Sequence, residues 1–268
     1  MPTDAAEMPF LDHLEELRWR IIWSLAALVV GVLVGFVVVF RFNLLVWMQG
    51  PILPFLHGHR LVYTHPGDGF SILMQMSILA GVVFALPVVM YQVWAFLAPG
   101  LHKHERRIVV PVILGIVGLF IAGAALAWYF VLPMTLKFMS GVGDEAFDSM
   151  ITASEYFGFV SSMVLAMGAV FELPIVILLL SAFGLVTPQF LAKFRRHAIV
   201  GSYLAAAIIT PGDLFITSIA LMIPLYLLYE LSIGLSWMVF RKRAQRALVD
   251  GDGDGDGDGG PETPEAVA

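Results

Sequence analysis

Long apolar runs separated by short polar stretches dominate the pattern of residues along the chain. A helix needs about 20 predominantly apolar residues to cross the roughly 30 Å hydrocarbon core of a bilayer. Five runs reach this length, and we predict a membrane-spanning helix in each: 21–40, 70–97, 108–132, 156–183 and 214–234. The pattern therefore predicts an all-α membrane protein whose membrane domain covers residues 1–240.

A sixth apolar run, 198–209, has only 12 residues. A helix of that length reaches roughly 18 Å, at about 1.5 Å per residue, which is less than the bilayer core. Either the membrane is thinner at this place, or this run and the next form a hairpin that stops short of the far side. The compact polar turn at 210–213 favours two short spans. We therefore expect six transmembrane helices, of which the last two are short.

The composition agrees with a membrane protein. Apolar residues make up 59% of the 268 positions and charged residues 13%, which leaves too little polar surface for a soluble globule of this size. The chain lacks cysteine, so disulfides, thiol catalysis and cysteine-based metal sites are excluded. The net charge of −6 includes five aspartates of a Gly-Asp repeat at 250–258. Because this repeat has almost nothing apolar to bury, residues 241–268 are predicted to form a disordered cytoplasmic tail.

Basic residues are distributed unequally between the two sides of the predicted bundle. One side holds Arg41, Arg60 and Lys137, and the other holds Arg18, Arg20, Lys103, Arg106, Arg107, Lys193, Arg195, Arg196, Arg241, Lys242, Arg243 and Arg246. An excess of Lys and Arg marks the cytoplasmic side of a membrane protein. Both termini of this multi-pass membrane protein are therefore predicted to be cytoplasmic.

Proline and glycine suggest how the helices pack. Pro87, Pro174 and Pro224 lie inside predicted spans, where each removes a backbone hydrogen bond and bends its helix unless neighbours compensate. We expect a curved, concave bundle, although prolines are also ordinary in membrane helices. Gly31 and Gly35 form a GxxxG pattern, which permits close helix approach but recurs by chance in apolar sequence.

Carboxylates near the predicted cytoplasmic surface are the first candidate functional groups. Apolar residues at helical spacing from Phe10 to Ile21 predict an interfacial helix with Glu15 and Glu16 on its opposite side. Glu105 lies among bases in the first cytoplasmic loop, where a lone acid is more often their neutralising partner. His102 and His104 are two positions apart and lack further ligands, so we expect no metal site and no cofactor.

Two further acids fall inside predicted spans. An ionised carboxylate at the bilayer centre costs at least about 2.5 kcal/mol, which makes Glu172 in the fourth span a functional candidate. The alternative is a neutral acid hydrogen-bonded to a neighbouring helix. Glu230 lies nearer the inner end of the last span and can reach the interface, so a structural role is expected for it.

The stretch 91–107, YQVWAFLAPGLHKHERR, resembles the signature of the TatC family, the large subunit of the twin-arginine translocase. HLEELR at 13–18 and FELP at 171–174 resemble the same family. The resemblance covers roughly residues 10–240. It implies a receptor for signal peptides of folded proteins that carry two consecutive arginines, which recruits small single-span subunits of the TatA and TatB type, self-associates and depends on the proton gradient.

The resemblance also assigns residues. Glu16 and Glu105 match the two cytoplasmic carboxylates that contact the arginines, and Glu15 is an additional acid that leaves open which neighbour takes the arginine. Glu172 matches a position that contacts a partner's membrane helix. Pro51 and Asp213 match functional positions on the outer side, and the alternative for Asp213 is an N-cap of the last span. The residues that match the rest of the peptide-binding patch are Leu17, Arg18, Phe96, Leu101, Lys103 and Arg106.

The chemistry of arginine recognition agrees with this assignment. Two guanidinium groups favour two carboxylates at a fixed separation, because each pair is bidentate and charge-assisted. At roughly 1.5–3 kcal/mol for a hydrogen bond to a charged group, useful selectivity needs a partly sheltered patch.

Other functions remain as alternatives. The chain has no nucleotide-binding P-loop and no H-E-x-x-H or G-x-S-x-G motif, so we do not expect an enzyme. A proton-coupled small-solute transporter would use Glu172 and need a midplane cavity. A lipid-modifying enzyme would need a convergent polar site with a nucleophile or metal. The expected surroundings are the lipid bilayer and protein partners, and no nucleic acid.

Overall fold

A computed structural model gives the structure of the chain and describes residues 4–56, 58–97, 109–141, 150–182, 184–210 and 215–251. These residues are almost entirely helical, and the extended pairing among them is one isolated bridge between Val62 and Thr152. The all-α prediction is confirmed. The helices are α1 (Asp4–Arg41), α2 (Leu44–Trp47), α3 (Asp68–Leu97), α4 (Val109–Leu126), α5 (Leu132–Gly141), α6 (Ala153–Phe171), α7 (Leu173–Ala182), α8 (Pro188–Lys193), α9 (Arg195–Ile209) and α10 (Ile216–Gly251).

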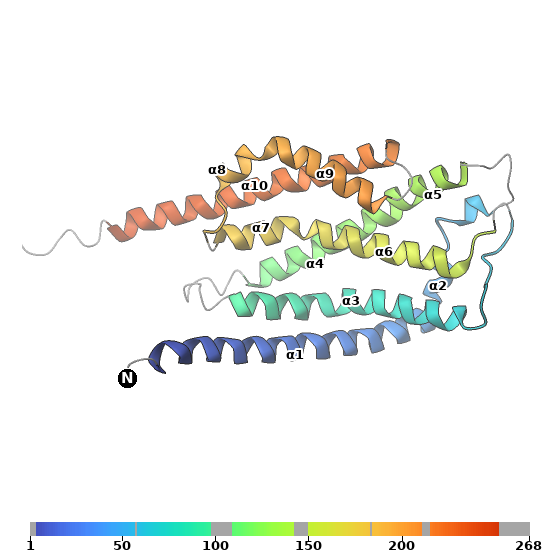
Figure 1. Ribbon diagram of the computed structural model, residues 1–268, viewed down its shortest axis with the longest axis horizontal. Coiled ribbons are helices and arrows are strands. Elements are labelled where there is room, and N and C mark those ends of the chain that lie inside the picture. Colours follow the sequence, from blue (N-terminus) through green and yellow to red (C-terminus); the bar gives the residue numbers. More distant parts are fainter. Residues whose placement is uncertain are drawn as a thin grey trace, which may run out of the picture.

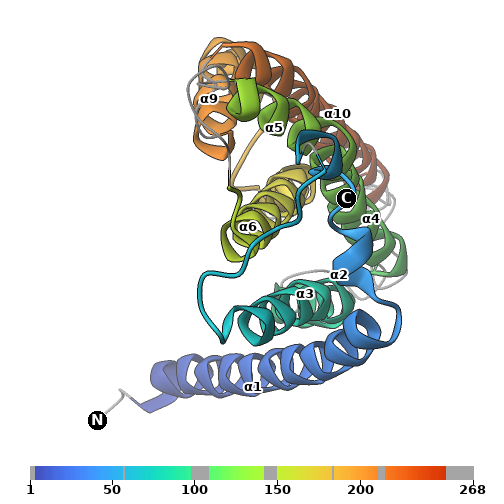
Figure 2. The same ribbon diagram turned by 90° about the vertical axis from the view of Figure 1, so that its right-hand side faces the viewer.

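The long helices run side by side along the longest axis of the molecule (Figure 1). Seen end-on, they follow a curve from α1 and α3 through α4 and α6 to α9 and α10, as the prolines led us to expect (Figure 2). In the described chain, five stretches are long and apolar enough to cross a membrane: Leu14–Arg41, Asp68–Phe96, Pro111–Gly141, Ala153–Ala182 and Ile216–Arg241. The protein is therefore a multi-pass membrane protein.

The first helix differs from the prediction. α1 continues without a break from Asp4 to Arg41, so the amphipathic N-terminal segment is an extension of the first span rather than a separate interfacial helix. At about 1.5 Å per residue, its 38 residues reach roughly 57 Å, well beyond the bilayer core. Nothing between residues 10 and 21 breaks a helix, because this stretch contains no proline or glycine.

The third span is also longer than predicted. α4 passes through a π-helical turn, Ala127–Val131, into α5, which ends at Gly141 rather than at 132. Pro133 lies inside this continuous helix, two residues after the π-helical turn ends at Val131. Residues 133–141, predicted to be loop, therefore extend the helix beyond the span.

The three intramembrane prolines have different outcomes. The fourth span divides at Glu172 into α6 and α7. α7 begins at Leu173, so Pro174 is its second residue. α3 and α10 pass Pro87 and Pro224 as continuous helices. Of the three prolines, only Pro174 therefore lies next to an interruption of its helix.

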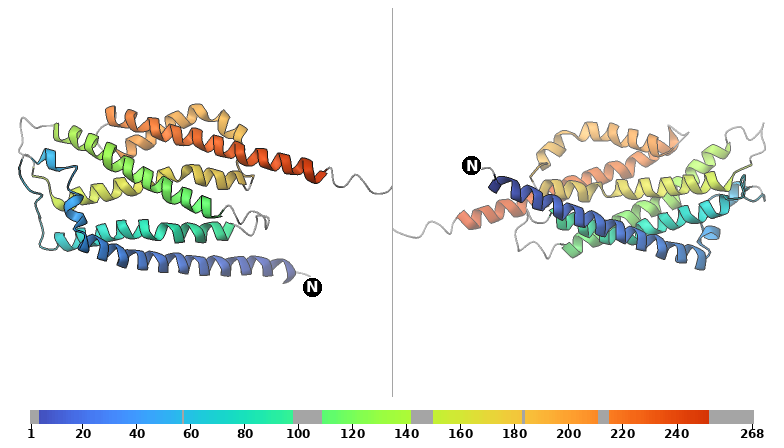
Figure 3. Two further views of the ribbon diagram at one scale, coloured as in Figure 1. Left: turned by 180° about the vertical axis from the view of Figure 1, so that it is seen from behind. Right: turned by 60° about the horizontal axis from the view of Figure 1, so that its bottom comes forward.

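The sixth predicted span is a short helix. α9 has 15 residues, or roughly 22 Å, and its end and the start of α10 fall short of the level that α5 and α6 reach (Figures 1 and 3). α10 is long, because it runs past the predicted end at 234 and the predicted domain boundary at 240 to Gly251. The segment 241–250 consists mostly of good helix formers, and the glycine repeat begins directly after it. Residues 252–268 lie outside the described chain, so their disorder stays a prediction.

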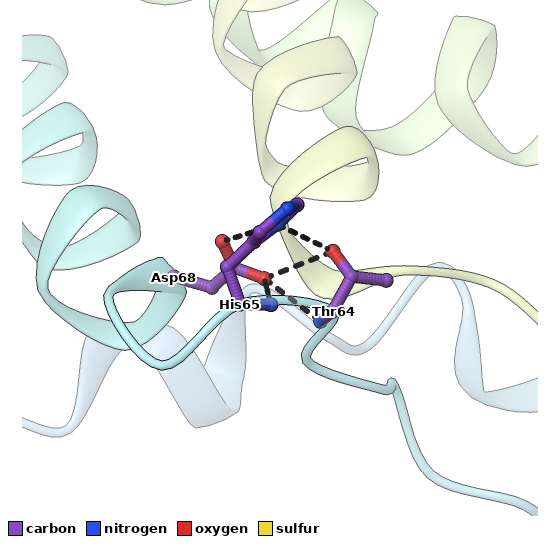
Figure 4. Close-up of polar contacts among 3 residues, drawn as sticks. All are labelled: Thr64, His65 and Asp68. Atoms are coloured by element: carbon purple, nitrogen blue, oxygen red, sulfur yellow. Dashed lines mark hydrogen bonds and ion pairs between the residues drawn. The ribbon is translucent and has the colours of Figure 1, made fainter.

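The loop between α1 and α3 folds into a cap at the end of the bundle opposite the N-terminus. It contains α2 and a 3₁₀ turn, Leu53–Phe55, and it buries Met48 and Ile52. The Tyr156 hydroxyl donates a 2.6 Å hydrogen bond to the Met48 carbonyl, which joins the cap to α6. The cap leads into α3 through Asp68, whose carboxylate accepts hydrogen bonds from the backbone N–H groups of Thr64 and His65 at 2.8 and 2.9 Å (Figure 4).

Candidate functional site near Glu16

The packing of α1 on α3 sets the position of the predicted site. A Cβ atom added at Gly31 would lie 2.5 Å from the Gly81 carbonyl oxygen, and one at Gly35 would lie 2.5 Å from the Ser77 carbonyl oxygen. A Cβ atom at Gly81 would lie 2.6 Å from the Val32 Cα atom. These three positions therefore bring the two backbones into direct contact, and the GxxxG pattern that the sequence left undecided is a helix-packing motif.

This contact also fixes the register of the two antiparallel helices. Gly31 lies against Gly81, and both helices rise by about 1.5 Å per residue. Glu16 is 15 positions before Gly31, and Phe96 is 15 positions after Gly81. The structure therefore brings two of the predicted site residues, Glu16 and Phe96, to the same level, where α3 ends.

Glu16 is held by an ion pair within its own helix. Its carboxylate accepts a 3.1 Å hydrogen bond from Arg20 Nε and a second, shorter one from the other end of that guanidinium. Leu17 is half-buried, whereas Glu15 and Arg18 are exposed. Arg20 was not predicted as a site residue, although the i,i+4 spacing of an acid and a base indicates this pair.

The remaining residues assigned to the patch, Leu101, Lys103, Glu105 and Arg106, lie outside the described residues, as does Asp213 on the other side. α3 ends, and α4 begins, at the end of the bundle where α1 begins (Figure 1).

Glu172 occupies the break between α6 and α7. Its backbone carbonyl accepts hydrogen bonds from Ile175 and Val176 N–H groups, both at 3.0 Å, which begin the second helix. Its side chain is only 8% exposed, and neither carboxylate oxygen has a hydrogen-bond partner within the described parts of the chain. A buried carboxyl group without a partner is costly whether charged or neutral. The alternative of an acid bonded to a neighbouring helix is therefore wrong for the described residues.

Pro51 lies in the cap, half-buried between the buried residues Met48 and Ile52. It is far along the bundle from Glu16, because the cap and the N-terminal end of α1 occupy opposite ends (Figures 1 and 3). The structure therefore does not bring Pro51 together with the predicted patch.

A polar cluster that could be predicted only in part from the sequence joins the middle of α10 to α8 and α9. Arg195 bonds both carboxylate oxygens of Glu230 at 2.9 Å, and the Tyr226 hydroxyl donates to the same carboxylate at 2.7 Å. The Tyr229 hydroxyl donates to the Leu191 carbonyl at 2.8 Å. These contacts attach α10 to α8 and α9, and they support the structural role expected for Glu230.

Comparisons with known proteins decide the family. The model of the family described as "Sec-independent protein translocase protein (TatC)" matches residues 12–224. The chain belongs to the TatC family. It is 37% identical to the Sec-independent protein translocase protein TatC of Aquifex aeolicus, over 89% of this chain and 98% of that protein. It is 38% identical to the TatC protein of Koribacter versatilis, over 89% of each chain.

A solved TatC structure has the same fold. The crystal structure of a twin-arginine translocase receptor, TatC, aligns with a TM-score of 0.71 and 36% identity, and covers 85% of this chain and 99% of that one. The family resemblance stated from the sequence is thus confirmed. As a TatC-family protein, the chain is a component of a Sec-independent protein translocase rather than an enzyme, and this membership displaces the alternative of a small-solute transporter.

Proposed function

We propose that this chain is the signal-peptide receptor of a twin-arginine translocase, and that it binds the paired arginines of a precursor where α1 carries Glu16 and α3 ends. The observation that carries the proposal is the α1–α3 register, which sets Glu16 level with Phe96. The segment that contains Glu105 joins α3 to α4 at this same end. We therefore expect that a short peptide bound there can reach both acids.

The Glu16 side chain suits arginine recognition. Its carboxylate already accepts two hydrogen bonds from the Arg20 guanidinium, so a signal-peptide arginine would share it with Arg20 or replace Arg20. A lysine ammonium cannot reproduce such a two-pronged contact. Because the Glu16 side chain is 35% exposed, we expect one such pair to contribute about 1 kcal/mol, at the upper end of the range for exposed pairs.

Glu16→Gln and Glu105→Gln test the proposal, and Glu15→Gln is the matched control because it removes an exposed neighbouring acid. Binding of a twin-arginine signal peptide and its twin-lysine version would be compared by photocrosslinking to the purified, membrane-inserted protein. We expect the first two variants to lose the preference for arginine about fivefold each and the control to keep it. Unchanged preference in both test variants would refute the acid pair, and a loss confined to Glu15→Gln would move the contact to Glu15.

We further propose that Glu172 contacts a polar side chain in the membrane helix of a small partner subunit of the TatA or TatB type. The support is its burial without a hydrogen-bond partner in the described chain, which an incoming hydroxyl or carboxamide would relieve. Glu172→Ala should reduce co-purification of the small subunits more than signal-peptide binding. Glu155→Gln, an exposed acid on the same helix, should change neither. Equal recovery of the subunits with Glu172→Ala would exclude the contact.

We propose that the end carrying Glu16 faces the cytoplasm of a cell inner membrane. The described basic residues at this end are Arg18, Arg20, Lys193, Arg195, Arg196 and Arg241, against Arg41, Arg60 and Lys137 at the other end. This excess has the sign expected for a cytoplasmic surface. Because the chain has no cysteine, a single introduced cysteine shows on which side of the membrane its position lies. A membrane-impermeant maleimide should label Glu155→Cys on intact cells and Gln189→Cys only after permeabilisation. The reverse pattern would invert the topology.

A further inference from the structure

An apolar pocket lies between α3 and α4 in the half of the bundle nearest the cap. Its volume is about 370 Å³, within the range of about 300–1,000 Å³ that is usual for ligand sites. It is lined by apolar and aromatic side chains from α1, α2, α3, α4, the π-helical turn and α6, among them Met76, Ala80, Phe84, Ile121, Ala124 and Ala125. The small alanines of α3 and α4 leave this space unfilled.

Two stacked tryptophans mark the end of the pocket nearest the cap. The rings of Trp47 and Trp128 lie 4.5 Å apart, within 8° of parallel. Trp128 belongs to the π-helical turn, and Trp47 is the last residue of α2. Tryptophan and tyrosine gather at the membrane–water interface, so this stack, with Tyr129 beside it, places the end of the pocket at headgroup depth.

The mouth of the pocket opens towards lipid. Phe84, Ile121 and Tyr129 line it and are 47%, 52% and 74% exposed, and all three belong to membrane-spanning stretches. The pocket is therefore continuous with the lipid-facing surface of the protein. A dry apolar space at this depth can be filled by hydrocarbon without the loss of any polar contact.

The positively charged side chain of Arg41 lies next to the headgroup end of the pocket. Arg41 ends α1 one turn after Val38, which lines the pocket, and its side chain is exposed. Within the described ranges it makes no ion pair with an acid of the chain. Phe40 and Phe42, on either side of it, are also exposed, as expected for residues at the interface. An unpaired guanidinium at headgroup depth is a ready partner for a phosphate.

We propose that this pocket binds one phospholipid from the leaflet on the cap side, with an acyl chain between α3 and α4 and the phosphate at Arg41. The lipid is preferentially anionic, because no acid among the described residues pairs with Arg41. Its chain completes the packing between the α1–α3 pair and α4, which small side chains leave open.

Native mass spectrometry of the protein released from bilayer nanodiscs tests the site. The nanodiscs contain either palmitoyl-oleoyl phosphatidylglycerol or palmitoyl-oleoyl phosphatidylcholine. We expect one retained phosphatidylglycerol per chain. Ala125→Leu, which fills the pocket, should lower retention at least tenfold, whereas Ala122→Leu adds the same side chain to an exposed position of α4 and should not. Equal retention in Ala125→Leu, or equal loss in Ala122→Leu, would overturn the acyl-chain site.

The headgroup contact has its own control. Arg41→Gln should remove the preference for phosphatidylglycerol over phosphatidylcholine, and Arg60→Gln, another base on the same side of the bundle, should keep it. Equal effects of the two changes would overturn the assignment of Arg41. A measurement on the unaltered chain keeps the test decisive if a variant misfolds. Phosphatidylglycerol with a diazirine in its acyl chain should label the peptides that contain Met76 and Ala125 more strongly than the lipid-facing part of α1 around Val29. Uniform labelling would indicate ordinary surrounding lipid and contradict the proposal.

Discussion

The two ends of the helix series are held together by opposite means. α1 packs on α3 by direct contact between the two backbones, at Gly31, Gly35 and Gly81. In contrast, α10 is attached to α7 and α9 through side-chain hydrogen bonds, which join Ser181 to Ser236 at 2.8 Å and Thr210 to Ser218 at 2.9 Å. The first contact depends on the absence of side chains, and the second depends on particular polar ones.

These are two different ways to hold helices together within a membrane. Helices in lipid gain little from hydrophobic burial, because lipid is as apolar as their side chains. Close backbone packing gains dispersion energy over a long contact but tolerates no added atom. Each interhelical hydrogen bond contributes less stabilisation than such packing, but it tolerates substitutions at the other positions of the two helices. The glycine contact is therefore suited to holding the register on which the proposed arginine site depends.

The largest expected effect comes from breaking the glycine contact. Gly81→Ala places a methyl group against the Val32 backbone, which cannot rotate away, so we expect a loss of about 1–3 kcal/mol in the free energy of unfolding. Gly118→Ala is the control, because a Cβ atom there meets nothing within 4 Å. Equilibrium unfolding in mixed micelles measures both, and equal stability of the two variants would show that α1 and α3 are not locked by this contact.

A smaller effect is expected from the polar side of the comparison. Ser236→Ala removes the buried bond to Ser181, and such bonds between membrane helices are worth about 0.6–2 kcal/mol. Ser162→Ala serves as the control, since its hydroxyl bonds to the Phe159 carbonyl of its own helix. The same unfolding assay should rank Ser236→Ala between Gly81→Ala and Ser162→Ala. A loss larger than that of Gly81→Ala would reverse the comparison.

The smallest effect should come from the ion pair of α9 and α10. The Arg195 and Glu230 side chains are 49% and 30% exposed, so we expect Glu230→Gln to cost only about 0.2–1 kcal/mol, and less at high salt. A double-mutant cycle with Arg195→Gln isolates the pair from the Tyr226 contact. A coupling energy that is large and independent of salt would mean that the pair is sheltered more than its exposure indicates.

Individual residues show why the candidate site could be predicted only in part. Glu16 and Phe96 could be named from motifs, but they are 80 positions apart in the chain, and only the glycine contact sets them at one level. The Arg20 contact was visible as an i,i+4 pair. The Trp47–Trp128 stack was not, because it joins a four-residue helix to a π-helical turn, and neither has a reliable local signal.

The sequence by itself determined the membrane class, the all-helical fold, the approximate spans and the family, because each follows from local apolar length or from a contiguous motif. Tertiary structure alone decided that the GxxxG pattern packs, that Glu172 is buried without a partner among the described residues, and that the apolar pocket exists. These features arise where backbones or side chains from separate helices meet, and the spacing of residues along one chain does not specify those meetings.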